Sequence, residues 1–286
     1  MKTAIIFSGF FRTFDYVKGT LTNNIMNTLD CDVFFSTPKT MFTEPKDEVP
    51  EYHNIHSQND ELVGANVIDF FGDKLKMFEL RDYDGQFYKD ALITNGVPSK
   101  NFCDQHTWRI LSQLHSTYFS LNIFKQYIES NGMNYDVVIL ARPDVIYHSR
   151  LNIGGIQWDK INYPSHAIFE GKLRILSPHA RPSPTLKKAF NDQMLIGSQN
   201  NILTFHSLYD NVMNYFREGI DFNHETMMGV HLIKNKIKWC GVNYITYELC
   251  RRAEGLIFDE TSSPQIITLP NNGLSARDRR LQRARR

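Results

Sequence analysis

Short apolar runs alternate with amphipathic helical stretches along this chain, and this alternation constrains the fold more than any other feature. The run TAIIFS at residues 3–8, which Gly9 ends, is typical of a buried strand, and so is CDVFFST at residues 31–37. Strand, helix and strand in this order indicate a parallel βαβ unit, so the sequence predicts an α/β fold. Between the two runs, apolar residues recur at the three- and four-residue steps of a helix, at Phe14, Val17, Leu21, Ile25 and Leu29.

The rest of the chain continues the alternation, and we expect a Rossmann-type, mostly parallel sheet flanked by helices. Polar stretches with several prolines interrupt the pattern at residues 38–60 and 177–185 and are predicted loops. The further predicted elements are helices over 62–71, 105–130, 202–216 and 224–235, and strands over 75–80, 137–141, 166–176, 191–198 and 237–249.

Charge is unevenly distributed along the 286 residues. The last ten residues, RDRRLQRARR, contain six arginines and one aspartate, whereas the whole chain has a net charge of only +1. The remaining chain is therefore acidic, which argues against broad binding of nucleic acid. Two interpretations of the arginine-rich end stay open: a solvated, disordered tail, or a peripheral contact with an anionic membrane surface or a partner.

The four cysteines form no CxxC pair, so the sequence contains no zinc site of the usual spacing, and a reduced protein is the simplest interpretation. The apolar run at the N-terminus is too short for a signal peptide. No run approaches the roughly 20 apolar residues that a membrane helix needs. We therefore expect a cytoplasmic protein without a transmembrane segment.

The strand predicted at 137–141 ends in Arg142, Pro143 and Asp144, which is an unusual ending for a buried strand. Ligands of open α/β sheets bind at the carboxyl ends of the strands. A carboxylate on a turn stiffened by proline is suited to hold Mg²⁺ or Mn²⁺, and the guanidinium of Arg142 is suited to phosphate oxygens. The alternative is a structural ion pair at the strand end.

The first strand ends in a similar way, with Ser8, Gly9 and then Arg12 before the first helix. Gly9 allows a ligand to approach the backbone closely, and Arg12 lies near a helix start, where N–H groups favour anions. This loop is neither a Walker loop nor GxGxxG. A glycine turn beside a surface arginine is the alternative.

Four segments in this order resemble a group of GT-A-type glycosyltransferases. IIFSGFFRTFD with DVFFST is similar to the opening of that group, and YDVVILARPDVIY is similar to the segment that carries an RPD form of its DxD metal motif. FNDQMLIGS and HETMMGVHL are similar to its later ND-containing segment and to its Glu-bearing helix. Relatives are found among bacterial and large-virus enzymes that build glycans. The resemblance implies one GT-A-like domain over residues 1–270, with a nucleotide-binding part to about 148 and an acceptor part from about 149, followed by a basic tail at 271–286.

The resemblance also implies roles for residues at the motif positions. Asp144 would ligate a metal ion that bridges the diphosphate of a nucleotide-sugar. Arg142 and Arg12 would contact phosphate or nucleotide, and Ser8 and Gly9 would line the pocket for base and ribose. A full DxD motif has two aspartates, and here Arg142 stands in place of the first, which puts metal dependence in question.

Glycosyl transfer with inversion needs a base near the acceptor hydroxyl, and Asp192 is the first candidate, followed by Glu225. The alternatives are an Asn-Asp turn before a strand and a helix-start carboxylate that favours the macrodipole. In some GT-A enzymes a late histidine completes the metal shell, which implies His231 or His224, although a histidine on a helix is more often structural. Gln113 lies on the long predicted helix. It either reaches the donor or is a polar residue on the exposed face of that helix.

Together these features predict a glycosyltransferase that moves a sugar from a nucleotide-sugar to a glycan or other hydroxyl acceptor. The resemblance implies, as the default, a UDP-linked donor and Mn²⁺ or Mg²⁺. Two other classes of function stay open: a non-catalytic protein of this fold that binds nucleotide or glycan, and a metal-dependent nucleotidyltransferase. A βαβ opening alone does not separate them.

Overall fold

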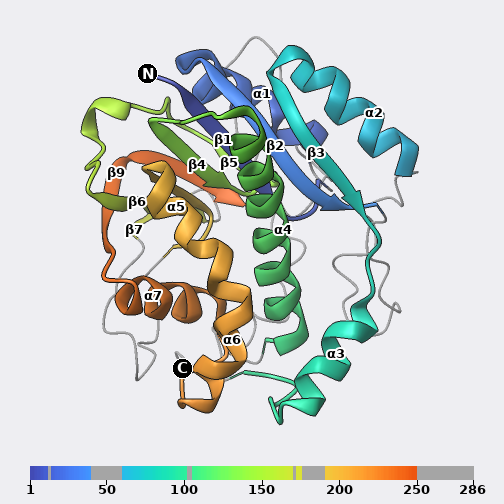
Figure 1. The fold of residues 1–286 in the computed structure, drawn as a ribbon. Coiled ribbons are helices and arrows are strands. Elements are labelled where there is room, and N and C mark those ends of the chain that lie inside the picture. Colours follow the sequence, from blue (N-terminus) through green and yellow to red (C-terminus); the bar gives the residue numbers. More distant parts are fainter. Residues whose placement is uncertain (12–13, 40–59, 102–104, 170–171, 176–190, 250–286) are drawn as a thin grey trace.

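A nine-stranded sheet forms the centre of the computed structural model, which describes residues 1–11, 14–39, 60–101, 105–169, 172–175 and 191–249 (Figure 1). The strands are ordered β3-β2-β1-β4-β8-β6-β9-β5, and β7 pairs with β6 off this path. Their bounds are β1 Thr3–Ser8, β2 Cys31–Pro38, β3 Leu75–Arg81, β4 Val137–Ala141, β5 Val145–Tyr147, β6 Lys160–Phe169, β7 Lys172–Ile175, β8 Met194–Gly197 and β9 Lys238–Leu249.

Helices cover both faces of this sheet (Figure 1). Each helix and strand predicted from the sequence has an observed counterpart, although the helix predicted at 202–216 is divided among α5, η5 and α6. The helices are α1 Phe14–Asn24, α2 Asp60–Phe71, α3 Gly85–Thr94, α4 Thr107–Asn131, α5 Gln199–Leu203, α6 Leu208–Arg217 and α7 His224–Lys234, with short 3-10 turns η1 Met26–Thr28, η3 Gly72–Lys74, η4 Ile153–Gly155 and η5 Thr204–Ser207.

Two elements were not predicted, α3 and β5. In α3 only Tyr88 and Leu92 are buried, so its apolar stripe is too short to show a helical period. The available signal was its cap: the side chain of Asp84 accepts hydrogen bonds from the backbone N–H groups of Gln86 (2.8 Å) and Phe87 (3.2 Å). β5 is only three residues long, and no alternation can be recognised over that length.

The two halves of the sheet differ in strand direction. From β3 to β4 all pairs are parallel, and the register places Thr3 beside Cys31 and Val137. Beyond β4, β8 is antiparallel to both β4 and β6, β9 is parallel to β6, and β5 is antiparallel to β9. The predicted parallel arrangement is thus confirmed in the first half, whereas the second half is mixed. β5, from the expected nucleotide-binding part, pairs at the far edge with β9 from the expected acceptor part, so one sheet contains both.

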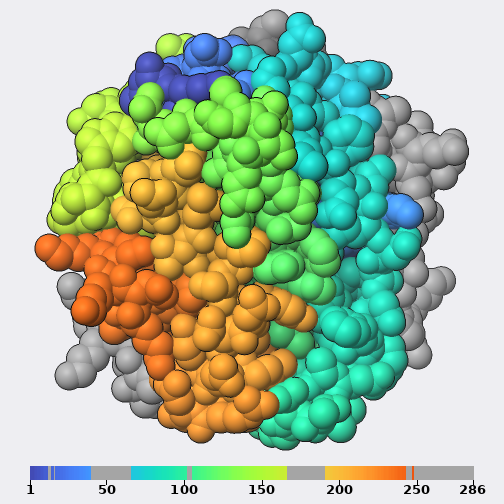
Figure 2. Space-filling view, in the orientation of Figure 1, coloured from blue at the N-terminus to red at the C-terminus, as the bar shows by residue number. Residues whose placement is uncertain are grey.

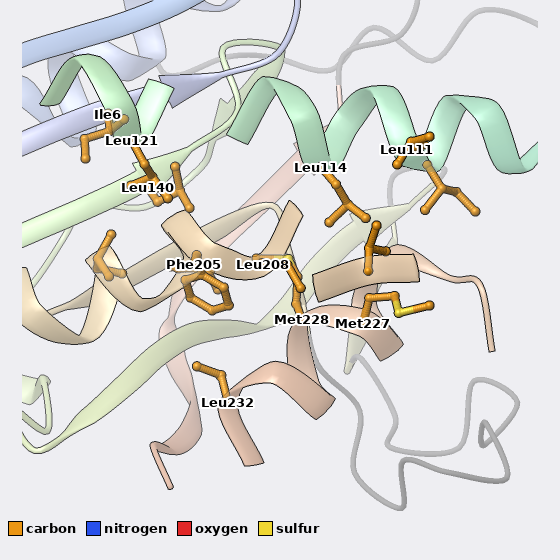
Figure 3. Packing of buried hydrophobic residues seen from close by; sticks show 14 of the residues in the cluster. Ile6, Leu111, Leu114, Leu121, Leu140, Phe205, Leu208, Met227, Met228 and Leu232 are labelled. Carbon is orange, nitrogen blue, oxygen red and sulfur yellow. The ribbon is translucent and has the colours of Figure 1, made fainter. Parts of the chain in front are cut away.

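The central strands are continuous apolar runs because both of their faces are buried. All six residues of β1 are buried. Ile5 and Phe7 belong to an apolar cluster with residues of α1 and α2, while Ala4 and Ile6 belong to a second cluster with residues of α4, α6 and α7 (Figure 3). The alternation of side chains along a strand therefore distributes β1 evenly between two cores.

The long helix α4 packs against one face of the sheet and contributes many residues to the second core. It ends at Gly132 with φ of 59°, a left-handed conformation that favours glycine, as the Asn131-Gly132 pair predicted. Figure 2 shows that α6, which is distant in sequence from α3 and α4, forms one continuous face of the molecule with them. No helix in the described part of the chain combines the length and apolar character that a membrane crossing requires.

Candidate active site

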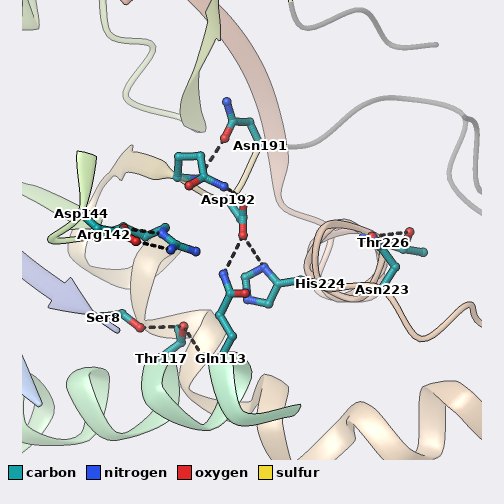
Figure 4. A network of polar contacts seen from close by, with 11 residues as sticks. Ser8, Gln113, Thr117, Arg142, Asp144, Asn191, Asp192, Asn223, His224 and Thr226 are labelled. Atoms are coloured by element: carbon teal, nitrogen blue, oxygen red, sulfur yellow. Dashed lines mark hydrogen bonds and ion pairs between the residues drawn. The ribbon is translucent and has the colours of Figure 1, made fainter. Parts of the chain in front are cut away.

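Polar side chains meet where the carboxyl ends of β1 and β4 lie beside the start of β8 (Figure 4). Because β1 and β4 are parallel and Phe7 pairs with Ala141, Ser8 and Arg142 leave the sheet at the same edge. β8 runs the opposite way and its first residue, Met194, pairs with Ala141. Asp192, two residues earlier, therefore emerges at this edge as well. The strand directions alone bring together residues from three separate segments.

Arg142 and Asp144 form a bidentate ion pair across Pro143. Arg142 Nε donates to Asp144 Oδ1 at 2.8 Å, and Nη2 donates to Oδ2 at 2.6 Å. The carboxylate is almost fully buried, with Asp144 2% exposed, while the Arg142 side chain is 19% exposed. Burial disfavours the charged guanidinium, but the Asp144 carboxylate outweighs it and raises the pKa of Arg142 above its usual range. Arg142 is therefore a permanent cation in a fixed orientation.

Asp192 occupies the middle of the cluster, and its side chain is 4% exposed. Its Oδ2 accepts a hydrogen bond from Gln113 Nε2 at 2.8 Å and lies 2.7 Å from His224 Nδ1, while Oδ1 accepts from Gln193 Nε2. Burial alone would raise the pKa of this carboxyl, but His224 and Arg142 hold it at about 2. Asp192 is thus an ionised carboxylate, and both of its oxygens are in contact with neighbouring side chains.

The start of α7 supplies His224 and Glu225. Asn223 caps this helix, since its Oδ1 accepts from the backbone N–H of Thr226 at 3.1 Å, and this fixes the direction of the first turn. The pKa of Glu225 is raised, first by burial and then by the negative charge of Asp192. Two carboxyl groups in one site therefore have pKa values that are displaced in opposite directions, a pattern that is typical of acid–base sites.

The helix α4 connects the first strand to this cluster. The hydroxyls of Ser8 and Thr117 are 3.0 Å apart, and Thr117 Oγ1 also lies 3.2 Å from the backbone carbonyl oxygen of Gln113, to which it donates. Gly9, next to Ser8, has φ of 118°, a conformation that favours glycine, and it faces Pro143. Thr117 was not predicted from the sequence, although it lies one turn after Gln113 on the same helix.

Asn191 and two tyrosines were also missed. Asn191 Nδ2 donates to the hydroxyl of Tyr247 at 2.7 Å and to the carbonyl of Pro164 at 2.9 Å, which ties the start of β8 to β6 and β9. The hydroxyl of Tyr147 is buried and has no hydrogen-bond partner among the residues that the structure describes. Burial raises the pKa of this phenol, and the charge of Asp144 raises it further. No local pattern marked Asn191 and Tyr247, because their contacts join segments that are distant in sequence.

The residues do not fit the metal site that the resemblance implies. Both oxygens of Asp144 are engaged by Arg142. Among the residues that the structure describes, no group of three His, Cys, Asp or Glu side chains is arranged to hold a metal ion. A divalent cation of this type needs several oxygen ligands, and Arg142 stands where the second carboxylate would be. We derive no step through a metal from this arrangement.

His231 does not belong to the site. Its Nδ1 lies 2.8 Å from the hydroxyl of Tyr215, and its Nε2 lies 2.8 Å from the carbonyl oxygen of Thr204. The ring is 1% exposed, and burial lowers its pKa. Both ring nitrogens therefore serve the packing of α7 against α6 and η5, which does not support the prediction that His231 is a metal ligand.

The structure brings together most of the predicted site residues. Those that meet at this sheet edge or at the start of α7 are Ser8, Gly9, Gln113, Arg142, Asp144, Asp192 and Glu225. Arg12 lies outside the described residues, as do most of the predicted loops at 38–60 and 177–185 and the basic tail.

A hollow of about 330 Å³ is lined by residues that do not belong to this cluster. Asp221 and Phe222, which lead into α7, line it together with Asn101 and Thr107 near the start of α4. None of the residues predicted for the donor site lines this hollow, so we do not place the donor there.

No protein-family model matches this sequence, and a comparison with curated proteins finds no significant match. The resemblance to GT-A-type glycosyltransferases thus stays a prediction, which depends on the four motifs and their order.

Proposed function

We propose that this protein is a glycosyltransferase that moves a sugar from a nucleotide-sugar to a glycan or other hydroxyl acceptor. The observation that carries the proposal is the meeting of a fixed cation, Arg142, with the carboxylate-centred cluster around Asp192 at one sheet edge. Transfer from a nucleotide-sugar releases a nucleoside diphosphate, and the negative charge that develops on it needs stabilisation. The transfer also needs a group that accepts the proton of the acceptor hydroxyl. The cluster contains groups for both tasks.

The geometry of Arg142 suits a diphosphate. A guanidinium has five N–H donors, and the pair with Asp144 uses one on Nε and one on Nη2. No described residue forms a hydrogen bond with the remaining donors, which suit phosphate oxygens on the partly exposed side of the group. Asp144 then acts as a positioning residue, because it fixes the guanidinium before the donor arrives, and a charge that is already oriented stabilises a leaving group without further reorganisation.

The donor nucleotide follows from the resemblance, which favours UDP. Ser8 and Gly9 lie at the end of β1, where nucleotides bind in open α/β sheets. The positive φ of Gly9 favours glycine, and because glycine has no side chain a ligand can approach the backbone closely. We therefore assign Ser8 and Gly9 to the nucleotide side of the site and Gln113, Asp192 and Glu225 to the sugar and acceptor side.

A non-catalytic protein that binds nucleotide or glycan is the second candidate. The observation that favours it is the saturation of Asp144 by Arg142, which leaves the motif without a free carboxylate. A nucleotidyltransferase is less well supported, since it would depend on the same carboxylates to hold its metal ions.

The proposal is tested first by binding. We expect UDP or another nucleoside diphosphate, at about 100 times its Kd, to raise the Tm of the wild-type protein by on the order of 5 °C. Arg142→Lys keeps the charge but loses the fork, so we expect its Kd for the nucleotide to weaken at least about tenfold. Arg150→Lys, at an exposed arginine eight positions later, is the matched control and should bind like the wild type.

Turnover distinguishes the three functions. A glycosyltransferase releases a nucleoside diphosphate from a nucleotide-sugar, a nucleotidyltransferase releases pyrophosphate, and a binding protein releases neither. If no nucleoside diphosphate or nucleotide-sugar shifts the Tm, the donor site proposed here does not exist.

A further inference from the structure

In the cluster around Asp192, the ring of His224 has one nitrogen that faces the carboxylate and one that does not. It is the first residue of α7 and is 5% exposed. Its Nδ1 lies 2.7 Å from Asp192 Oδ2, a close contact of ring and carboxylate rather than a well-aligned hydrogen bond. Its Nε2 is buried, and no residue in the described part of the chain forms a hydrogen bond with it. A buried polar atom without a partner is costly, so it calls for a functional explanation such as a ligand or a catalytic role.

The Asp192 carboxylate determines which nitrogen of His224 carries the proton. A carboxylate is only an acceptor, so the neutral ring is stabilised with its proton on Nδ1, facing Asp192. Nε2 then holds a lone pair that points away from the carboxylate. An imidazole held by a carboxylate in this tautomer is an arrangement that abstracts protons in enzymes of several unrelated folds.

The two carboxyl groups of the site are weaker candidates for this task. Both oxygens of Asp192 are already in contact with Gln113, Gln193 and His224. Burial and then the charge of Asp192 raise the pKa of the Glu225 carboxyl, which disfavours its ionised form. Nε2 of His224 is therefore the acceptor that the cluster leaves available.

We propose that His224 is the general base of the transfer and that Asp192 is the residue that positions it, an inference that rests on the proposed function. The proton of the acceptor hydroxyl passes to Nε2 of His224 while the acceptor oxygen forms a bond to the anomeric carbon. The bond from that carbon to the diphosphate oxygen breaks, and the nucleoside diphosphate leaves with the electron pair. The imidazolium that results is paired with the Asp192 carboxylate and later returns its proton to solvent.

The charges around His224 support this step. Asp192 from the start of β8 and Glu225 from its own helix are the negative or ionisable neighbours, and Arg142 acts on Asp192 from the β4 side. In Figure 4 the Asp192 carboxylate lies between the guanidinium of Arg142 and the ring of His224. Because the acceptor oxygen attacks the anomeric carbon in the same step in which the diphosphate leaves, the proposed step predicts inversion at that carbon.

The test compares three variants with the nucleotide-sugar that the wild type uses. For His224→Gln we expect kcat to fall by about 10²–10⁴-fold while KM for the donor changes by less than about threefold. Its pH–rate profile should lose the acidic limb of the wild type. Asp192→Asn should lower kcat as well, since the amide no longer imposes the tautomer. His206→Gln is the matched control, because this histidine contacts Asn122 and Tyr118 away from the cluster, and it should retain the wild-type rate.

A second measurement separates a base from a structural role. In His224→Ala, added imidazole should restore part of the lost rate, and the wild-type product should have the inverted anomeric configuration by NMR. A His224→Gln enzyme with wild-type kcat and pH profile, or a product with retained configuration, would overturn the assignment of His224 while leaving the glycosyltransferase proposal standing. Absence of donor binding in the wild type would instead overturn the proposed function, and this inference with it.

Discussion

Two buried pairs of side chains lie in the same site, Arg142–Asp144 and Asp192–His224. They differ in which of their atoms are available to a ligand. In the Arg142–Asp144 pair both carboxylate oxygens are used and the cation does not lose its proton. In the Asp192–His224 pair the partner of the carboxylate is a histidine ring, and its Nε2 has no hydrogen-bond partner among the described residues. The first pair can hold charge in place, whereas the second can exchange a proton. The residues of the RPD motif therefore form one pair, and the proposed proton transfer takes place in the other.

The largest effect should follow from breaking the first pair. Arg142→Leu leaves the Asp144 carboxylate buried and unpaired, so we expect the free energy of unfolding to fall by about 3–5 kcal/mol in urea titrations. The double variant Arg142→Leu/Asp144→Leu removes both charges and should lose much less. Equal losses in the single and double variants would show that the two side chains are not coupled.

The second pair should give a smaller, pH-dependent effect. The pKa of Asp192 is lowered from 3.8 to about 2 in the folded protein, so its contribution is present above about pH 4 and is lost as the pH falls toward 2. The shift corresponds to roughly 2 kcal/mol. We expect the stability of Asp192→Asn to fall less steeply than that of the wild type between pH 5 and pH 2.5, as measured by urea unfolding. Parallel curves for the two proteins would contradict this assignment.

A third variant separates the two histidines of α7. His231→Phe removes the hydrogen bonds to Tyr215 and Thr204 and should lower the free energy of unfolding by about 1–2 kcal/mol. Because His231 packs against α6 and η5, the Kd for the nucleotide should stay within about twofold of the wild type. If this variant binds the nucleotide more weakly but keeps the stability of the wild type, His231 belongs to the nucleotide site.

The same two histidines show what the sequence can and cannot predict. His224 and His231 are seven residues apart, so they lie on nearly the same helix face, and periodicity does not distinguish them. They differ by roughly 10 Å along the axis, which decides which ring meets Asp192. That position depends on how α7 packs against distant elements, and no local pattern encodes it.

The strands and the position of the site were more predictable, because both follow from local patterns. Continuous apolar runs identified β1, β2 and β4, and the rule that ligands bind at carboxyl strand ends selected Ser8, Arg142 and Asp144. The antiparallel entry of β8 was not predictable, since it depends on pairing across more than fifty residues. Whether Asp144 faces a metal or Arg142 was also beyond the sequence, because it depends on the rotamers of two side chains.

The smallest effect concerns metal, and it is the sharpest test of the difference between the pairs. Because both oxygens of Asp144 are engaged, we expect the Kd of the wild type for a nucleoside diphosphate to change by less than about threefold between Mn²⁺ and EDTA in calorimetric titrations. A cation strengthens diphosphate binding through the protein only where a carboxylate can turn to it, and here that would require Arg142 to release Asp144. If Mn²⁺ tightens binding more than about tenfold, and Asp144→Asn abolishes that gain, then Asp144 exchanges its arginine for a metal when the donor binds. The Arg142–Asp144 pair would in that case be the resting state of a metal site, and the contrast with the Asp192–His224 pair would hold only for the protein without its donor.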